Sequence, residues 1–154
     1  MITSYALYKL LHLVAVVLFL GNATLGLFWV AHAERTRDPA FVGHAMQGII
    51  RADRWFTTPG VILITAAGIA AAMAGGYRIL AVGWIAGSIG MFILSGLVFG
   101  FALAPLQKRI VVEAGNAADT EALAGSLRRW HAIGWVAVTP LWLAVAMMVL
   151  KWPG

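Results

Sequence analysis

The chain has 154 residues, of which 62% are hydrophobic and only 11% are charged, and its mean hydropathy is +0.88. Soluble domains carry roughly a quarter of charged residues, so this composition excludes an ordinary soluble enzyme. It predicts a polytopic membrane protein that forms a single domain over residues 1–154. Cysteine is absent, which excludes disulfides, thiolate metal sites and Cys-attached haem. We assign the excess of 11 basic over 6 acidic residues to loops on the cytoplasmic side and not to nucleic-acid binding.

The first apolar stretch, residues 5–32, predicts the first membrane span. Few polar residues interrupt it: Lys9, His12, Asn22 and Thr24. A helix of this length is roughly 42 Å long, which is enough to cross a bilayer and its headgroups. Ala31-His32-Ala33 resembles a signal-peptide cleavage site, but the apolar stretch before it is much longer than the h-region of about 7–15 residues. We therefore expect a retained helix.

Three further apolar stretches predict spans at about residues 55–75, 79–104 and 132–152. The second is expected to begin at Thr57-Thr58-Pro59, because threonine can cap a helix and proline fits a first turn. Pro140 is expected to bend the fourth span. The predicted fold class is all-α, a transmembrane four-helix bundle with amphipathic cytoplasmic segments.

The basic residues predict the orientation in the membrane. Eight lie between the first and second or between the third and fourth spans: Arg35, Arg37, Arg51, Arg54, Lys108, Arg109, Arg128 and Arg129. The other side holds only Lys9, Arg78 and Lys151. The positive-inside rule then puts both long connections in the cytoplasm and both termini on the periplasmic side of a bacterial inner membrane.

The cytoplasmic connections are expected to be helical. Asp38-Pro39 suits a helix start, and apolar residues then recur at helical spacing between Phe41 and Ile50. This pattern predicts an amphipathic helix that lies at the membrane interface before the second span. Asp53, flanked by Arg51 and Arg54, is expected to join a charge cluster on the same side.

A second connecting segment is expected to start at Asp119-Thr120-Glu121. From there Leu123, Leu127 and Trp130 would extend the fourth span inward. This segment is too short to form a separate domain.

Glycines predict how the spans pack. The third span contains the pairs Gly83/Gly87 and Gly96/Gly100 at GxxxG spacing, and the second contains Gly60 and Gly68. Such residues let helix backbones approach closely or leave room beside a flat ligand, and close packing is the commoner role. The GxxxG pairs also offer a surface for a homo-oligomer.

His12 is the strongest candidate for a functional residue, because a titratable side chain inside a span is costly. It could ligate haem iron or another metal as neutral imidazole, or it could simply hydrogen-bond to a carbonyl or to Ser88. Four residues of the third and fourth spans lie at a matching depth and complete the predicted cofactor site: Met91, Ser88, Gly87 and Met147. Methionine can be a second axial haem ligand, and Gly87 would leave space for a porphyrin.

The other three histidines predict a weaker metal site. His32 and His131 lie at the inner ends of the first and fourth spans, and His44 lies on the interfacial helix. Together with His12 they are the predicted metal ligands, although interfacial histidines often contact only headgroups and water. No pattern indicates a hydrolase nucleophile, a phosphate loop or a paired-carboxylate site.

Two runs carry a family resemblance: LLHLVAVVLFLGNATLGLFWVAH and RADRWFTTPGVILITAAGIAAAMAGG. They closely resemble a bacterial family of four-span predicted integral membrane proteins of unknown function. More distantly, the chain resembles HemJ-type protoporphyrinogen oxidases and CopD-like membrane domains, with His12, His32, Trp55 and Pro59 in the corresponding places. The HemJ resemblance implies that His12 binds b-type haem. The HemJ pattern also has a functional lysine in the third span, and residues 79–104 contain none.

These observations lead to one main functional prediction and two alternatives. The main prediction is an inner-membrane bundle that binds haem b, or a related tetrapyrrole, through His12 for electron transfer or redox chemistry with a redox partner. If it is an enzyme, it would be a haem-dependent oxidoreductase. The alternatives are a cofactor-free scaffold or pathway for a small solute or metal ion, and CopD-like copper handling, for which the dense Met/His clusters are missing.

Overall fold

The computed structural model describes residues 3–116 and 120–154, which form four long helices and no strand. In chain order the elements are α1 (Ser4–Glu34), α2 (Pro39–Ala52), the π-helical turn η1 (Asp53–Thr57), α3 (Thr58–Ala74), α4 (Gly83–Val98), the π-helical turn η2 (Phe99–Leu103), α5 (Ala104–Gly115) and α6 (Thr120–Leu150). Each of the four long helices is apolar enough to cross a membrane. The predicted all-α, four-helix membrane bundle is confirmed.

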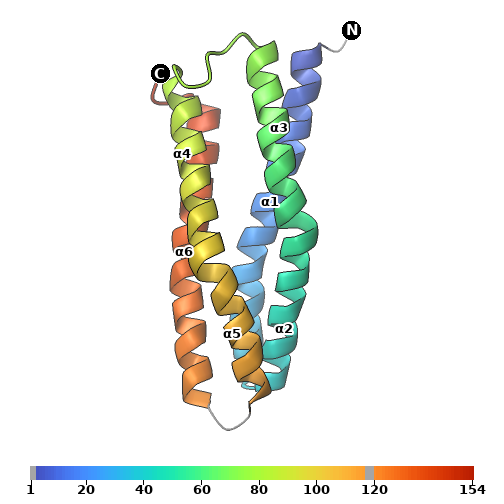
Figure 1. Ribbon diagram of the computed structural model, residues 1–154, viewed down its shortest axis with the longest axis vertical. Helices are drawn as coiled ribbons and strands as arrows, with labels where there is room; N and C mark the ends of the chain where they lie inside the picture. Colours follow the sequence, from blue (N-terminus) through green and yellow to red (C-terminus); the bar gives the residue numbers. More distant parts are fainter. Residues whose placement is uncertain (1–2, 117–119) are drawn as a thin grey trace.

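The helices run antiparallel, so the bundle has two distinct ends (Figure 1). The terminal end holds the start of α1, the connection 75–82 and the end of α6. The loop end holds the turn from α1 to α2, the end of α5 and the start of α6. The choice of membrane and of the side that each end faces stays a prediction.

The second and third long helices each contain a π-helical turn shortly before a proline. In η1 the Thr58 N–H donates to the Asp53 carbonyl, and in η2 the Ala104 N–H donates to the Phe99 carbonyl. Pro59 and Pro105 come next and have no N–H to donate. A wider turn at this point accommodates the missing donor and the proline ring, so that the helix continues.

The second long helix therefore does not begin at Thr57-Thr58-Pro59, where the sequence predicts the start of the second span. The helix runs unbroken from Pro39 to Ala74, and Thr57 makes no capping hydrogen bond. For the same reason α2 is not a separate helix, and its place at the membrane interface stays a prediction. α2 continues directly into η1 and α3, and it buries Val42, Met46 and Ile49 inside the bundle.

The other predicted boundaries are partly confirmed. Asp38 caps α2 by accepting a hydrogen bond from the Ala40 N–H at 2.9 Å. The third long helix starts at Gly83, later than predicted, and runs beyond residue 104 to Gly115. The inward extension of the fourth span is confirmed, with Leu123, Leu127 and Trp130 all buried, whereas Asp119 lies outside the described residues.

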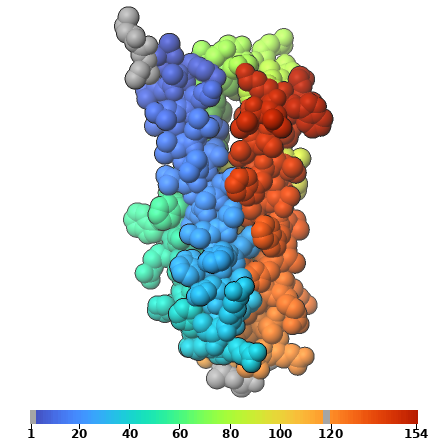
Figure 2. Space-filling view, turned by 180° about the vertical axis from the view of Figure 1, so that it is seen from behind, coloured from blue at the N-terminus to red at the C-terminus, as the bar shows by residue number. Residues whose placement is uncertain are grey.

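The packing divides the bundle into two halves. Toward the terminal end α1 packs along α3 and α4 packs along α6, as two separate pairs (Figure 1). Toward the loop end α2 also contacts α5 and α1, and α5 contacts α6. The largest fully buried side chains belong to this second half: Trp130, Met46, Ile110 and Val30. Figure 2 shows a hollow between α1 and α6 at the terminal end, which we call the terminal cleft.

Glycines allow the closest contacts within the two pairs. A Cβ atom at Gly60 would lie 3.2 Å from Phe19 Cβ, and one at Gly68 would lie 2.9 Å from His12 Nδ1. At Gly87 a Cβ would collide with the terminal methyl group of Met147. By contrast, nothing lies within 4 Å of the same position at Gly96 or Gly100. Close packing is therefore the role of Gly60, Gly68 and Gly87. The homo-oligomer surface expected from the GxxxG pairs stays a prediction.

Substitution of Gly68 tests the contact between α1 and α3. Gly68→Ala places a methyl group against the His12 ring and should lower the free energy of unfolding by about 1–3 kcal/mol. Gly90→Ala is the control, because no atom lies within 4 Å of its Cβ position. Unfolding by SDS in detergent micelles measures both. Equal stability of the two variants would contradict the described contact.

Candidate functional site

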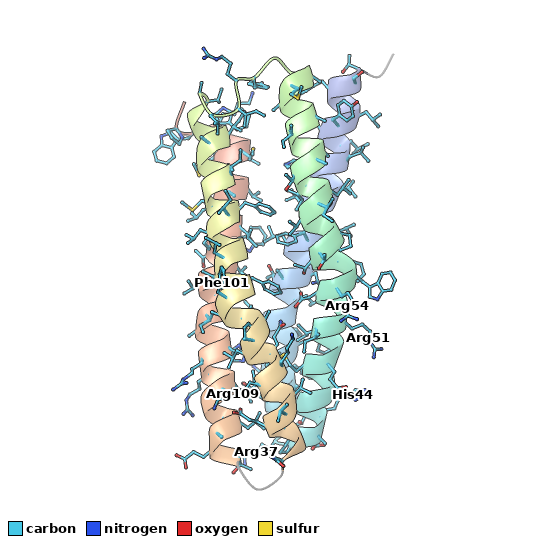
Figure 3. The ribbon with its side chains drawn as sticks, viewed as in Figure 1. Arg37, His44, Arg51, Arg54, Phe101 and Arg109 are labelled. Atoms are coloured by element: carbon cyan, nitrogen blue, oxygen red, sulfur yellow. The ribbon has the colours of Figure 1, made fainter. Side chains whose placement is uncertain are left out.

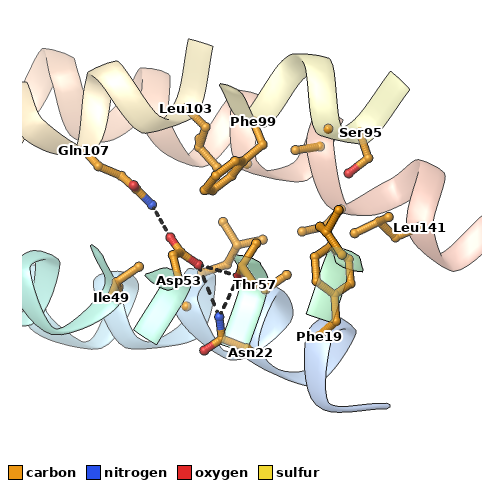
Figure 4. Close-up of a pocket in the computed structure, with 18 of the residues that line it drawn as sticks. Phe19, Asn22, Ile49, Asp53, Thr57, Ser95, Phe99, Leu103, Gln107 and Leu141 are labelled. Carbon is orange, nitrogen blue, oxygen red and sulfur yellow. Dashed lines mark hydrogen bonds between the residues drawn. The ribbon is translucent and has the colours of Figure 1, made fainter. Parts of the chain in front are cut away.

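A network of polar side chains around Asp53 lies in the middle of the bundle (Figure 4). Asp53 Oδ1 accepts hydrogen bonds from Thr57 Oγ1 at 2.8 Å and from Asn22 Nδ2 at 3.2 Å. Asp53 Oδ2 accepts one from Gln107 Nε2 at 2.9 Å. Asn22 Nδ2 also lies 3.1 Å from Thr57 Oγ1. One carboxylate therefore joins α1, η1 and α5.

Local helix geometry explains why these side chains meet. Asp53 and Thr57 are four residues apart at the two ends of η1, so their side chains lie on the same side of the helix. Asn22 is the polar residue on the face of α1 that also carries Phe19 and Gly26, and all three line one cavity. Gln107 is only 3% exposed and reaches the carboxylate from α5.

The prediction that Asp53 joins a charge cluster with Arg51 and Arg54 is wrong. Consecutive residues of a helix point about 100° apart, so the arginines lie on the outer surface while Asp53 turns inward. No ion pair of Asp53 is found in the described residues, and its partners are neutral. The sequence analysis missed Gln107 and Asn22 as site residues. Asn22 is one of the few polar residues of an apolar stretch, whereas Gln107 directly precedes Lys108 and Arg109 and carries no such signal.

A cavity of about 80 Å³ lies beside this network. Its polar lining consists of Asn22, Asp53, Thr57, Ser95, Gln107 and Trp130, and apolar side chains form the remainder. A water molecule takes about 30 Å³ of liquid volume, so the cavity has room for a few water-sized groups. A drug-sized ligand needs roughly 300 Å³ or more, and therefore a tetrapyrrole does not fit here.

Trp130 provides an unpaired hydrogen-bond donor at the same cavity. The side chain is 2% exposed, and none of the described residues accepts a hydrogen bond from its Nε1–H. An unsatisfied buried donor costs about 1–3 kcal/mol, so such a group usually has a partner. Asp53 and Trp130 therefore line the same cavity, and the indole N–H lacks an acceptor among the described residues.

An aromatic pair bridges the two helix pairs next to the cavity. Phe19 of α1 lines the cavity, and its ring centroid lies 5.8 Å from that of Phe92 in α4 at an interplanar angle of 58°. Beyond this contact, toward the terminal end, the two helix pairs form the terminal cleft. The aromatic pair is therefore a contact between α1 and α4 at the edge of the cavity.

His12 lies in the contact between α1 and α3, outside the central cavity. Its Nδ1 lies 2.9 Å from the Ile64 carbonyl oxygen. Because a carbonyl can only accept, Nδ1 is the donor, and in the neutral ring Nε2 then keeps the lone pair. Seven residues separate His12 from Phe19, so both lie on the same face of α1 about two turns apart.

The other predicted cofactor residues belong to the α4–α6 pair. Ser88 donates hydrogen bonds to the carbonyls of Trp84 and Ala144 at 2.7 and 3.1 Å, and Met147 packs against Gly87. Met91, also on α4, is partly buried. No hydrogen bond joins His12 to any of these residues in the part of the chain described. Their joint role as a haem site stays a prediction.

The inner histidines occupy three different surroundings. His131 Nε2 lies 3.2 Å from Glu34 Oε1, which ties α6 to α1 at the loop end. His32 stacks on Phe28 with ring centroids 6.4 Å apart, and His44 is exposed on α2 (Figure 3). Among residues 3–116 and 120–154, no group of three or more His, Asp or Glu side chains is arranged to hold a metal ion.

A comparison with known protein families shows to which family the chain belongs. Residues 6–152 match DUF2269, a family described as predicted integral membrane protein. The chain belongs to this family. No curated protein and no solved structure matches it. The DUF2269 match agrees with the resemblance to four-span membrane proteins, and the HemJ and CopD resemblances gain no support from it.

Removal of the carboxylate tests the network. Asp53→Ala leaves the donors of Asn22, Thr57 and Gln107 without their acceptor, and we expect the free energy of unfolding to fall by about 3 kcal/mol or more. In a double-mutant cycle, Asp53→Asn and Gln107→Leu should couple by about 0.5–3 kcal/mol.

The control cycle pairs Asp53→Asn with Glu121→Gln, an exposed residue at the start of α6, and should show no coupling. SDS unfolding curves of the single and double variants give both coupling energies. Zero coupling between Asp53 and Gln107 would contradict the hydrogen bond between them.

Proposed function

We propose that this protein binds a small polar solute in its central cavity and provides part of a pathway for such solutes across the membrane. The observation that carries the proposal is that Asp53 and Trp130, whose N–H has no acceptor among the described residues, line one cavity. An ionised carboxylate offers about four acceptor positions, and protein donors occupy three of them. One position on Oδ2 is left for a ligand.

The size and chemistry of the cavity define the solute class. A volume of about 80 Å³ suits a molecule of a few non-hydrogen atoms. The ligand would donate one hydrogen bond to Asp53 Oδ2 and accept one from Trp130 Nε1. Small amides such as formamide and urea have both groups and serve as probes. Polar residues inside membrane bundles commonly mark the route of a solute or ion.

The terminal cleft supports a route into the cavity. The Phe19–Phe92 pair, which joins α1 to α4, lies at the edge of the cavity. Rotation of either ring would open the cavity toward the cleft without unfolding a helix. At the loop end, the buried side chains of Met46, Ile110 and Trp130 close the bundle.

The indole N–H of Trp130 provides a site-specific readout of binding. In protein labelled with ¹⁵N-tryptophan, this resonance is assigned by its loss in Trp130→Phe. Titration with formamide or urea should shift it in a saturable way, because the N–H gains an acceptor. Asp53→Asn should weaken binding roughly tenfold, since a hydrogen bond to a charged group contributes about 1.5–3 kcal/mol.

The exposed Trp55 and Trp135 are the internal controls, with 69% and 56% of their surfaces accessible. Their indole resonances should shift only linearly with probe concentration. The proposal fails if the Trp130 resonance shows no saturable shift with either probe, or if Asp53→Asn binds as tightly as the parent protein.

A second candidate function is haem-based electron transfer through His12. The supporting observation is the hydrogen bond from Nδ1 to the Ile64 carbonyl, since metal-bound histidines commonly donate their second ring nitrogen to a carbonyl or carboxylate. Nε2 would then be the ligating atom. Because the central cavity is too small, the tetrapyrrole would lie at the terminal cleft, and its electrons would pass to a redox partner at the membrane.

A visible spectrum tests this second function. Protein produced with ample haem supply and purified in detergent should show a Soret band, and His12→Ala should abolish it. His32→Ala is the control and should keep the band, because His32 stacks on Phe28 at the opposite half of α1. Absence of any Soret band in the parent protein would refute haem binding.

A further inference from the structure

Three basic side chains line a surface groove on the outer side of the bundle. Arg51, Arg54 and Lys108 form the groove together with Gln47, Ile50 and Val111, and its volume is about 360 Å³. It lies between the second long helix and α5, in the half of the bundle nearer the loop end. Figure 3 shows Arg51 and Arg54 projecting outward from the bundle. We call this the basic groove.

The three cations have no acidic partners in the residues that the structure describes. Arg109 pairs with Glu113, His131 pairs with Glu34, and Asp53 faces the interior, where neutral side chains surround it. Neither ion pairs nor hydrogen bonds are found for Arg51, Arg54 or Lys108. The basic groove therefore concentrates uncompensated positive charge from two helices.

Two exposed aromatic residues lie beside the basic groove. Trp55 lies one turn from Arg51 on the same face, and Phe101 lies two turns from Lys108 on the same face. Both lie on the terminal-end side of the cations, and they are 69% and 82% exposed. Tryptophan is enriched where acyl chains meet headgroups, and Trp55 together with Phe101 makes the surface beside the cations apolar.

We propose that the basic groove binds the headgroup of an anionic phospholipid, and that a lipid with two phosphates fits it best. Three cations on two helices exceed the charge of a single phosphate. Basic pockets between membrane helices are the usual environment for such headgroups. The apolar surface beside Trp55 and Phe101 would hold the acyl chains, which distinguishes a lipid from a free phosphate.

This lipid site lies back to back with the Asp53 network. Arg54 directly follows Asp53, and Lys108 directly follows Gln107, so the Asp53–Gln107 hydrogen bond lies inside the two helices whose outer faces form the groove. A phosphate bridging Arg54 and Lys108 would hold the same two helices together from outside. Lipid binding is independent of the proposed solute function, which the Trp130 resonance tests separately.

Native mass spectrometry of the full chain from detergent measures lipid binding. The probes are cardiolipin, phosphatidylglycerol, phosphatidylcholine and inorganic pyrophosphate. We expect cardiolipin to bind most tightly, and the triple variant Arg51→Gln/Arg54→Gln/Lys108→Gln to weaken its binding roughly tenfold or more. The charge-conserving variant Arg51→Lys/Arg54→Lys/Lys108→Arg should keep binding within a few-fold.

The matched control removes three exposed charges elsewhere near the loop end: Arg35→Gln/Arg128→Gln/Arg129→Gln. Its cardiolipin affinity should equal that of the parent protein. An equal loss in this control would show a general charge effect and overturn the proposal. Undiminished binding in the groove variant, or pyrophosphate binding as tight as that of cardiolipin, would overturn it as well.

Discussion

The carboxylate of Asp53 is the constraint on which the rest of the structure depends. Burying a carboxylate in the interior of a helical bundle is costly unless hydrogen bonds or ion pairs compensate it. Here, donors from Asn22, Thr57 and Gln107 offset that cost. The three donors come from α1, η1 and α5, so the carboxylate is compensated only when these helices lie side by side. The network therefore specifies the packing of the bundle where its two halves meet.

In η1 and in α5, one side chain faces the interior of the bundle and the next residue in the chain faces its outer surface. In η1, Asp53 faces the cavity while Arg54 faces the basic groove, and in α5 Gln107 and Lys108 are divided in the same way. Both helices also contain a π-helical turn before a proline, and such turns are frequent at functional sites. Both faces belong to the same two helices. Ligand binding at one face would therefore act on the helices that also form the other.

The sequence was sufficient for the fold but not for the site. Four apolar stretches and the Asp38 cap predict the helices, because burial in lipid leaves backbone groups no alternative to helix. Thr57-Thr58-Pro59 misled the prediction, since local rules treat proline as a helix start while the π turn absorbs it inside a helix. The neighbouring arginines likewise suggested that Asp53 belongs to a charge cluster. Its real partners, Asn22 and Gln107, are 31 and 54 residues away, and only the packed bundle brings them together.

An experimental structure at a resolution that shows ordered water would test the central claim most directly. The account predicts density in the cavity within hydrogen-bonding distance of both Asp53 Oδ2 and Trp130 Nε1. Asp53→Asn should weaken that density while the helices keep their positions. A cavity closed by repacked apolar side chains, with the Trp130 N–H bonded to a protein carbonyl, would contradict the account.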